Sequence, residues 1–258
     1  MDRYDRKVQA ERVLSKTFWS SLIRWDTIEN FRKIGEIGLP FASDVIVDQN
    51  AIHFEMLASK GIINDVDVPE LIDQRNKRCL NGAQSSIDAA SLIFAHTILD
   101  GAAYDLGRVC MIASPSDWAC RLDSRKVTLG DTKTGTYFDM LESTLNKYLI
   151  DEFERFSLLK KLTLLCETCK PPSGWLPPEF VGVYNYDVDT LRLIDDTRHN
   201  VVHGRDLFAG LEKIESDLFY MRMTQLYMLK LVERHCGLKV NPVHFLPDNA
   251  TITDQCES

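Results

Sequence analysis

The sequence predicts an all-α protein. Most segments place apolar residues three or four positions apart, which is the spacing of one helix face, and few segments show the alternation of a strand. Apolar residues make up 45% of the chain and charged residues 26%, a composition that is ordinary for a globular protein and excludes global disorder. We therefore expect a four-helix-bundle-like domain with an N-terminal helical extension.

The N-terminal extension is expected over residues 1–70. Its apolar residues keep helical spacing at first, and Gly35, Gly38 and Pro40 are expected to end that helix because glycine and proline are poor interior residues. Gly61 is expected to end a later, short helix. The elements expected in this extension are a helix over 3–34, a short strand over 45–48 and a short helix over 53–61.

The main domain is expected over residues 71–237, followed by an irregular tail over 238–258. Pro69 suits the first turn of a helix, and the proline-rich PPSGWLPP cannot continue one. Asp187 or Asp189 can cap the third helix, and Gly204 can close it. The expected helices are 70–113, with a break near Asn81-Gly82 left open, then 137–168, 188–203 and 210–236, with a loop over 114–136.

Composition also restricts the class of function. The formal net charge is −8, and residues 192–240 hold eight Lys or Arg against seven Asp or Glu, whereas proteins that bind nucleic acid over a broad surface are usually basic. The seven cysteines are an odd number and the charged N-terminus is unlike a signal peptide, which favours reduced thiols in the cytoplasm. The longest nearly apolar run, 89–99, is about half of a membrane span. We expect a soluble cytoplasmic protein that makes no membrane contact.

Several common motifs are missing from the sequence. It contains no GxxxxGK[ST] loop, no strand–GxGxxG–helix unit and no GxSxG elbow. Cys166 and Cys169 form a CxxC without a second CxxC or a histidine pair nearby, so ordinary packing is the favoured interpretation. Asp105 lies on the apolar track of its helix and is expected to have a buried structural partner.

The stretch DDTRHNVVHG (195–204) concentrates titratable groups at the end of the third helix. A helix C-terminus favours His and Arg because cations complement the helix dipole, but this explains only one or two such residues. A metal site is a second interpretation, since Asp195, His199 and His203 lie at i, i+4 and i+8 on one stripe. Arg198 would repel a cation there, and no HExxH glutamate is present, so we expect no metal and no cofactor.

The third interpretation is RNA cleavage. The run Arg198-His199-Asn200-Val201-Val202-His203 resembles the signature of HEPN domains, in which an arginine, a polar residue and a histidine stand in that order with four to six residues between Arg and His. In that family the motif closes the third main helix of a bundle and is followed by one more long helix, and the order of helices expected over about 80–237 is similar. The resemblance implies a metal-independent endoribonuclease that leaves 2′,3′-cyclic phosphate and 5′-hydroxyl ends.

The resemblance also implies roles for the residues. His203 would be the general acid and base, Arg198 the phosphate-binding cation, and His199 and Asn200 would orient or stabilise the phosphate. Histidine titrates near neutral pH and arginine forks onto phosphate oxygens, so the residue types suit this chemistry. Positions five apart differ by about 140° around a helix. Arg198 and His203 could therefore meet if the helix unwinds at 202–204, or if two copies of the site meet across a dimer. HEPN nucleases resemble the second case, so the resemblance implies a homodimer built on the third and fourth helices.

The resemblance extends to biological setting. Families of this type often serve as toxins, antiphage effectors or RNA-processing enzymes, and the acidic charge favours a selective RNA, an activating partner or an inhibitor protein. The alternative is a non-catalytic helical interaction module, in which Arg198 and His203 form a structural pair. A catalytic pair must be reachable by solvent in a positive cleft, whereas a structural pair should be buried and satisfied internally.

Overall fold

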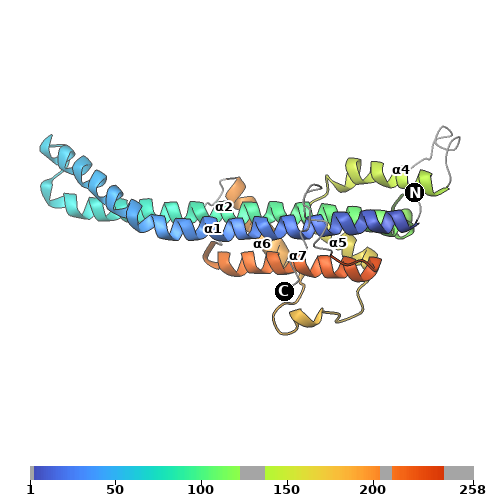
Figure 1. Cartoon of the computed structure of the whole chain (residues 1–258). Coiled ribbons are helices and arrows are strands. Elements are labelled where there is room, and N and C mark those ends of the chain that lie inside the picture. Colours follow the sequence, from blue (N-terminus) through green and yellow to red (C-terminus); the bar gives the residue numbers. More distant parts are fainter. Residues whose placement is uncertain (1–2, 123–136, 204–210, 241–258) are drawn as a thin grey trace, which may run out of the picture. The chain divides into compact units, whose positions relative to one another are not determined.

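The computed structural model describes residues 3–122, 137–203 and 211–240, and these residues form helices and connecting turns without a strand (Figure 1). The all-α class is therefore confirmed for the described part of the chain. Its α-helices are α1 (Arg3–Ser59), α2 (Val68–Ala113), α3 (Pro115–Ala119), α4 (Tyr137–Tyr148), α5 (Leu158–Cys169), α6 (Val188–Val202) and α7 (Ile214–Cys236).

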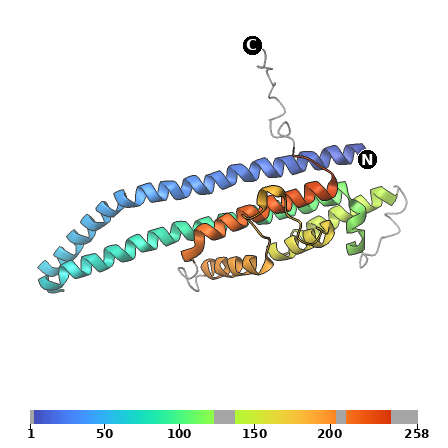
Figure 2. The same cartoon turned by 90° about the horizontal axis from the view of Figure 1, so that it is seen from below.

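The prediction that Gly35, Gly38 and Pro40 end the first helix is wrong. Helix α1 runs through all three for 57 residues, so the strand expected over 45–48 and the separate helix over 53–61 are parts of it. Its second half changes direction in Figure 2, as is typical of a helix with an internal proline. Contacts with α2 on both sides of Pro40 hold the helix together: Arg32 binds Asp88, and the amide of Asn50 donates to that of Asn76 at 2.6 Å.

Gly35 allows the two helices of this hairpin to approach each other. A Cβ atom at this position would lie 2.5 Å from Cδ1 of Ile87, closer than carbon atoms can pack. The expected end at Gly61 is confirmed, since this glycine has a φ of +67°. The amide of Ile62 donates to the carbonyl of Leu57 at 3.0 Å, which is the long hydrogen bond of a Schellman motif.

Helix α2 is continuous over 46 residues, without the break that was left open at Asn81-Gly82, and Pro69 lies in its first turn as expected. The single helix expected over 137–168 is wrong, because α4 passes into a π-helical turn, η3 (Leu149–Phe153), and the chain restarts at α5. Ser157 causes the restart: its backbone is extended, with a ψ of 155°, and its hydroxyl accepts the amide of Lys160. The chain then leaves α5 through Lys170, whose φ is +41°.

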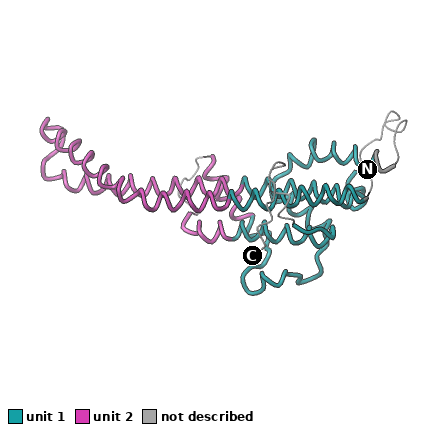
Figure 3. Tube along the Cα trace, viewed as in Figure 1, with its two compact units in different colours: residues 1–24, 97–191, 220–258 teal, residues 25–96, 192–219 magenta. Residues whose placement is uncertain are grey.

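The described residues fall into two compact units, which Figure 3 colours separately. Unit 1 combines residues 1–24, 97–191 and 220–258. Its core contains the fully buried Trp118 and Phe153, whose rings meet edge to face with centroids 5.6 Å apart. Gly107 of α2 packs against this core, because a Cβ there would lie 2.5 Å from the Phe153 ring.

Unit 1 also contains the buried polar partners that an apolar helix requires. Asp105 accepts a hydrogen bond from the hydroxyl of Thr17 at 3.1 Å, so the expected structural partner exists. The ammonium of Lys161 binds both carboxylate oxygens of Asp100 at 2.9 Å. Burial raises the pKa of the Asp105 carboxyl, and the Thr17 hydroxyl opposes that shift.

Unit 2 combines residues 25–96 and 192–219. It holds the hairpin of α1 and α2, most of α6, and the start of α7 after a short 3-10 helix, η5 (Leu211–Lys213). Its buried apolar residues include Trp25, Ile28, Leu92 and Ala95. Each unit combines stretches that are separate in the sequence, so the units do not correspond to the predicted segments 1–70, 71–237 and 238–258. Those domain boundaries remain a prediction.

Other expected elements agree in part with the structure. Helices α6 and α7 lie where the third and fourth helices of the main domain were expected, whereas 115–122 is helical where a loop was expected. Residues 123–136 of that loop, Gly204 and positions 241–258 of the tail lie outside the described residues. Across the described ranges, no helix combines the length and apolarity that crossing a membrane requires.

Candidate functional site

The start of α6 is fixed by Asp187, one of the two cap residues considered. Its carboxylate accepts the amides of Asp189 and Thr190, both at 3.1 Å, which satisfies donors that a helix N-terminus leaves free. The hydroxyl of Tyr220 accepts the amide of Asp187 at 2.6 Å. Asp187 and Tyr220 both belong to unit 1, so this end of α6 is anchored within that unit.

The other end of α6 carries the RHNVVH run. The helix extends to Val202, and the amide of His203 still donates to the carbonyl of His199 at 3.0 Å. Unwinding at Val202 or His203, which was one way to bring Arg198 and His203 together, is therefore not observed. Regular helical geometry separates positions five apart, such as Arg198 and His203, by about 140° around the axis.

Arg198 is held by a carboxylate one turn earlier. Its Nε and Nη2 atoms both lie 3.0 Å from Oδ1 of Asp195, and the same oxygen lies 3.0 Å from Nε2 of His96 on α2. The hydrogen bond from His96 and the neighbouring Arg198 guanidinium lower the pKa of the Asp195 carboxyl, although partial burial opposes them. Asp195 is thus a shared acceptor that fixes an arginine and a histidine, all within unit 2.

The two histidines of the run form a second group. His199 and His203 are both exposed, and their ring centroids lie 4.2 Å apart at an interplanar angle of 55°. This contact follows from their i, i+4 spacing, which places them on one helix face. Asn200, which follows His199 in the sequence, is half-buried. The structure therefore pairs His199 with His203, and Arg198 with Asp195 and His96.

The arrangement disfavours the metal interpretation of Asp195, His199 and His203. The contacts of Asp195 are to His96 and Arg198, and a guanidinium beside the carboxylate repels a cation. Within the described ranges, no group of three or more His, Cys, Asp or Glu side chains is arranged to hold a metal ion.

His96 is the residue of this site that the sequence did not identify. It lies in the nearly apolar run 89–99 of α2, and its only signal was that a polar ring on an apolar helix needs a hydrogen-bond partner. Its side chain is 16% exposed, so Asp195 supplies that partner in a largely dry environment. A histidine alone among apolar residues therefore indicated a contact, but the sequence could not indicate with which helix.

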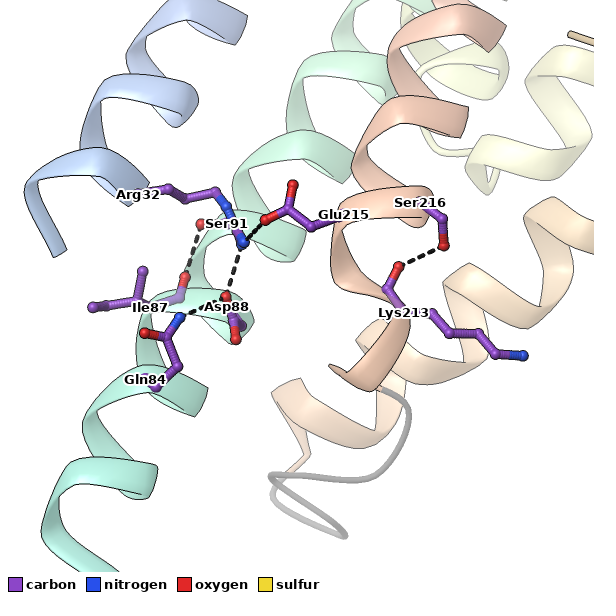
Figure 4. Close-up of polar contacts among 8 residues, drawn as sticks. All are labelled: Arg32, Gln84, Ile87, Asp88, Ser91, Lys213, Glu215 and Ser216. Atoms are coloured by element: carbon purple, nitrogen blue, oxygen red, sulfur yellow. Dashed lines mark hydrogen bonds and ion pairs between the residues drawn. The ribbon is translucent and has the colours of Figure 1, made fainter. Parts of the chain in front are cut away.

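A second polar network in unit 2 also escaped the sequence analysis. Figure 4 shows Arg32 of α1 reaching Asp88 of α2 and Glu215 of α7, and the Arg32–Asp88 contact measures 2.7 Å. Gln84 donates to the same oxygen of Asp88 at 3.2 Å. Arg32 and Asp88 are nearly buried, with side chains 10% and 12% exposed, so this network fixes helices rather than presenting groups to a ligand.

No protein-family model, curated protein or solved structure matches the chain. The function must therefore be argued from the residues of the site and their geometry.

Proposed function

We propose that the chain is a metal-independent endoribonuclease of the HEPN type, with its site at the C-terminal end of α6. The observation that carries the proposal is the exposed His199–His203 pair beside an arginine that Asp195 holds in place. An imidazole that solvent reaches can exchange protons with a substrate, and a fixed guanidinium can bind a phosphate. A buried, internally satisfied pair could do neither.

In the proposed reaction, His203 takes the proton of a ribose 2′-hydroxyl and returns a proton to the leaving 5′-oxygen. Arg198 binds the phosphate through Nη1, the guanidinium nitrogen outside its contacts with Asp195, while charge develops on the phosphate oxygens. His199 and Asn200 orient the same phosphate. The products are a 2′,3′-cyclic phosphate and a 5′-hydroxyl, without a metal or another cofactor.

The site is proposed to be composite, formed across a homodimer. One helix keeps Arg198 and His203 on different faces, so Arg198 of one copy would act with His203 of the other. Exposed apolar side chains support a dimer surface on α6 and the start of α7: Leu193 is 68% exposed, Val202 47% and Phe219 49%. The acidic net charge favours a selective RNA, or control by an activating or inhibitory protein, as in a toxin or antiphage effector.

The test is cleavage of total cellular RNA by the purified protein in EDTA. His203→Ala and Arg198→Ala should each lose at least about 100-fold in rate, because each removes a group that acts in the transition state. His53→Ala is the matched control, since His53 is an exposed histidine on α1 far along the sequence from the site. Cleavage that survives in both site variants would contradict the proposal, and activity only with added zinc or manganese would replace it with a metal mechanism.

Mixing the two inactive variants tests the composite site. If Arg198 and His203 act from different copies, a mixed dimer of Arg198→Ala and His203→Ala contains one intact site. Equal mixing after subunit exchange should then restore about a quarter of the wild-type rate, because half of the dimers are mixed and each has one working site of two. No restoration would show that the two residues act within one copy.

A second function is favoured by one specific observation. Arg198, Asp195 and His96 satisfy one another within a single chain, as a structural network does. This supports a non-catalytic helical interaction module. That function would be established by absence of RNA cleavage under every condition, together with loss of stability or of dimerisation in Arg198→Ala.

A further inference from the structure

Three cysteine thiols from three different helices meet in the interior of unit 1. The sulfur atoms of Cys110 on α2 and Cys169 on α5 lie 3.9 Å apart. Cys236, the last residue of α7, is close enough to Cys110 for each thiol to shift the pKa of the other. Cys110 is therefore the central thiol of a cluster that connects α2, α5 and α7.

The CxxC motif does not explain this cluster. Cys166, the other cysteine of the motif, points its sulfur at that of Met228, 4.0 Å away, whereas Cys169 faces Cys110. The two thiols of the motif thus have different neighbours. The contact of Cys169 with Cys110 joins helices that are distant in sequence.

The three thiols differ in exposure, and Cys110 and Cys236 also differ in acidity. Cys110 is completely buried and Cys169 is 6% exposed, whereas Cys236 is only half-buried. Hydrogen bonds from Cys110 and Ser114 lower the pKa of Cys236, although burial opposes them, whereas contacts with Cys169 and Cys236 raise the pKa of Cys110. Of Cys110 and Cys236, the thiolate, which is the reactive form, therefore forms more readily at Cys236, which solvent reaches better.

A cleft in the same unit reaches one thiol of the cluster, Cys169. It has a volume of about 870 Å³, and its walls include Cys169 and His235, the residue before Cys236. Nε2 of His235 lies 3.0 Å from a carboxylate oxygen of Asp117, another wall residue. A molecule the size of hydrogen peroxide fits this space many times over.

We propose that Cys110, Cys169 and Cys236 form a peroxide-responsive thiol site that closes a disulfide at Cys110. The Cys236 thiolate attacks one oxygen of hydrogen peroxide, the O–O bond breaks, and Cys236 becomes a sulfenic acid as hydroxide leaves and takes up a proton. The Cys110 thiol then gives up its proton and attacks the Cys236 sulfur. An S–S bond forms, the S–O bond breaks and water leaves, so two thiols are oxidised and one peroxide is reduced to water.

Cys169 provides a second position for the disulfide. Its sulfur can attack Cys110 of the new disulfide and release the Cys236 thiolate, with no further oxidant. The sulfur atoms of Cys110 and Cys169 must approach each other by about 2 Å to reach the length of a disulfide bond. The final link joins α2 to α5 or to α7, and either link would stiffen unit 1. This inference is independent of the proposed nuclease activity.

The experiment treats the full-length protein with hydrogen peroxide, removes the peroxide with catalase, and blocks remaining thiols with N-ethylmaleimide in denaturant. Mass spectrometry without reduction should show loss of one pair of alkylatable thiols, and peptides that link Cys110 to Cys236 or to Cys169. Cys79→Ser is the matched control, because Cys79 is exposed in unit 2 and its loss should leave the link unchanged.

Two variants test the order of steps. Cys236→Ser should slow oxidation of Cys110 at least tenfold, because the accessible thiolate is gone. Cys110→Ser should abolish both links and leave Cys236 to oxidise further to the sulfinic acid. The proposal is wrong if Cys110 stays fully alkylatable in the wild-type protein, or if peroxide oxidises only cysteines outside this cluster. Both outcomes are measured on the wild-type protein, so they do not depend on whether Cys110→Ser folds.

Discussion

Each of the two units buries a cation, and the two cations are held in different ways. In unit 1, the Lys161 side chain is 3% exposed and its ammonium binds one carboxylate, that of Asp100. In unit 2, the Arg32 side chain is 10% exposed and its guanidinium binds two carboxylates, those of Asp88 and Glu215. An ammonium is a compact point charge, whereas a guanidinium has separate donors that can serve two acceptors at once.

The number of partners determines how strongly a buried charge depends on each of them. A buried charge with one partner depends on that partner entirely, whereas a charge with two partners keeps one of them when the other is lost. The α6 site differs again, because Asp195 is one acceptor shared by two partners, Arg198 and His96, at 25% exposure. Arg198 shares this partly exposed acceptor, so exchanging its contact with Asp195 for one with a ligand should cost little free energy.

Asp100→Ala should produce the largest loss of stability among the polar substitutions considered. It leaves the Lys161 ammonium buried without its counter-charge, and we expect the free energy of unfolding to fall by about 3 kcal/mol. Urea unfolding measures this loss. Asp73→Ala is the control, because Asp73 and its partner Lys77 are well exposed, and its loss should stay below about 0.5 kcal/mol. Adding Lys161→Met should recover much of the stability of Asp100→Ala; no recovery would mean that the unpaired charge is not the cause.

Asp88→Ala should cost less, about 2 kcal/mol, although Asp88 is more deeply buried than Asp100. The reason is that Arg32 keeps Glu215 as a second carboxylate (Figure 4). The same urea measurement compares the two variants directly. Asp88→Ala combined with Glu215→Ala should lose more than the sum of the two single losses, and strict additivity would show that the two carboxylates do not compensate for each other.

Asp195→Asn should have a smaller effect that depends on pH. We expect a loss of about 1 kcal/mol near neutral pH, because His96 and Arg198 lose a charged acceptor. The folded protein holds the pKa of Asp195 below its unfolded value of about 4, so this stabilisation is present above pH 4 and disappears as pH falls through the lower folded pKa. Unfolding of wild type and variant should therefore differ at pH 7 and converge under acid conditions.

Asp105 in unit 1 is a control, because its contribution to stability should depend on pH with the opposite sign. Burial raises its pKa, so the folded protein favours the protonated form, and its contribution to stability is present at low pH and lost as pH rises through the raised pKa. Asp105→Asn should therefore gain stability relative to wild type as pH rises. If both aspartate variants responded to pH with the same sign, the contrast between the two environments would be wrong.

The sequence predicted the helices better than it predicted their ends. Helical periodicity identified α2, α6 and α7, since each presents apolar residues at helical spacing to a core. It failed where long-range packing overrides a local signal: Pro40 and Gly35 do not end α1, because α2 holds both sides of that region. It also failed at Ser157, where a cap residue inside an apolar pattern splits one expected helix into two.

The site shows the same limit. The spacing of His199 and His203 predicted that they share a face, and their rings do meet, because this depends only on helix geometry. The partners of Arg198 could be predicted only in part. Asp195 lies one turn away on the same helix, whereas His96 lies about a hundred residues earlier, and no local pattern connects the two. The sequence also offered no way to predict that Cys110, Cys169 and Cys236 lie near one another.

His203→Ala should have the smallest effect on stability, below about 0.5 kcal/mol, since His203 is exposed at the end of α6. The same substitution is expected to have the largest effect on RNA cleavage, and this opposition separates a catalytic residue from a structural one. Thermal unfolding of His203→Ala beside Asp195→Asn makes the comparison within one site. A loss for His203→Ala that equals or exceeds that of Asp195→Asn would place His203 among the structural groups, and the interaction module would then be the better account of α6.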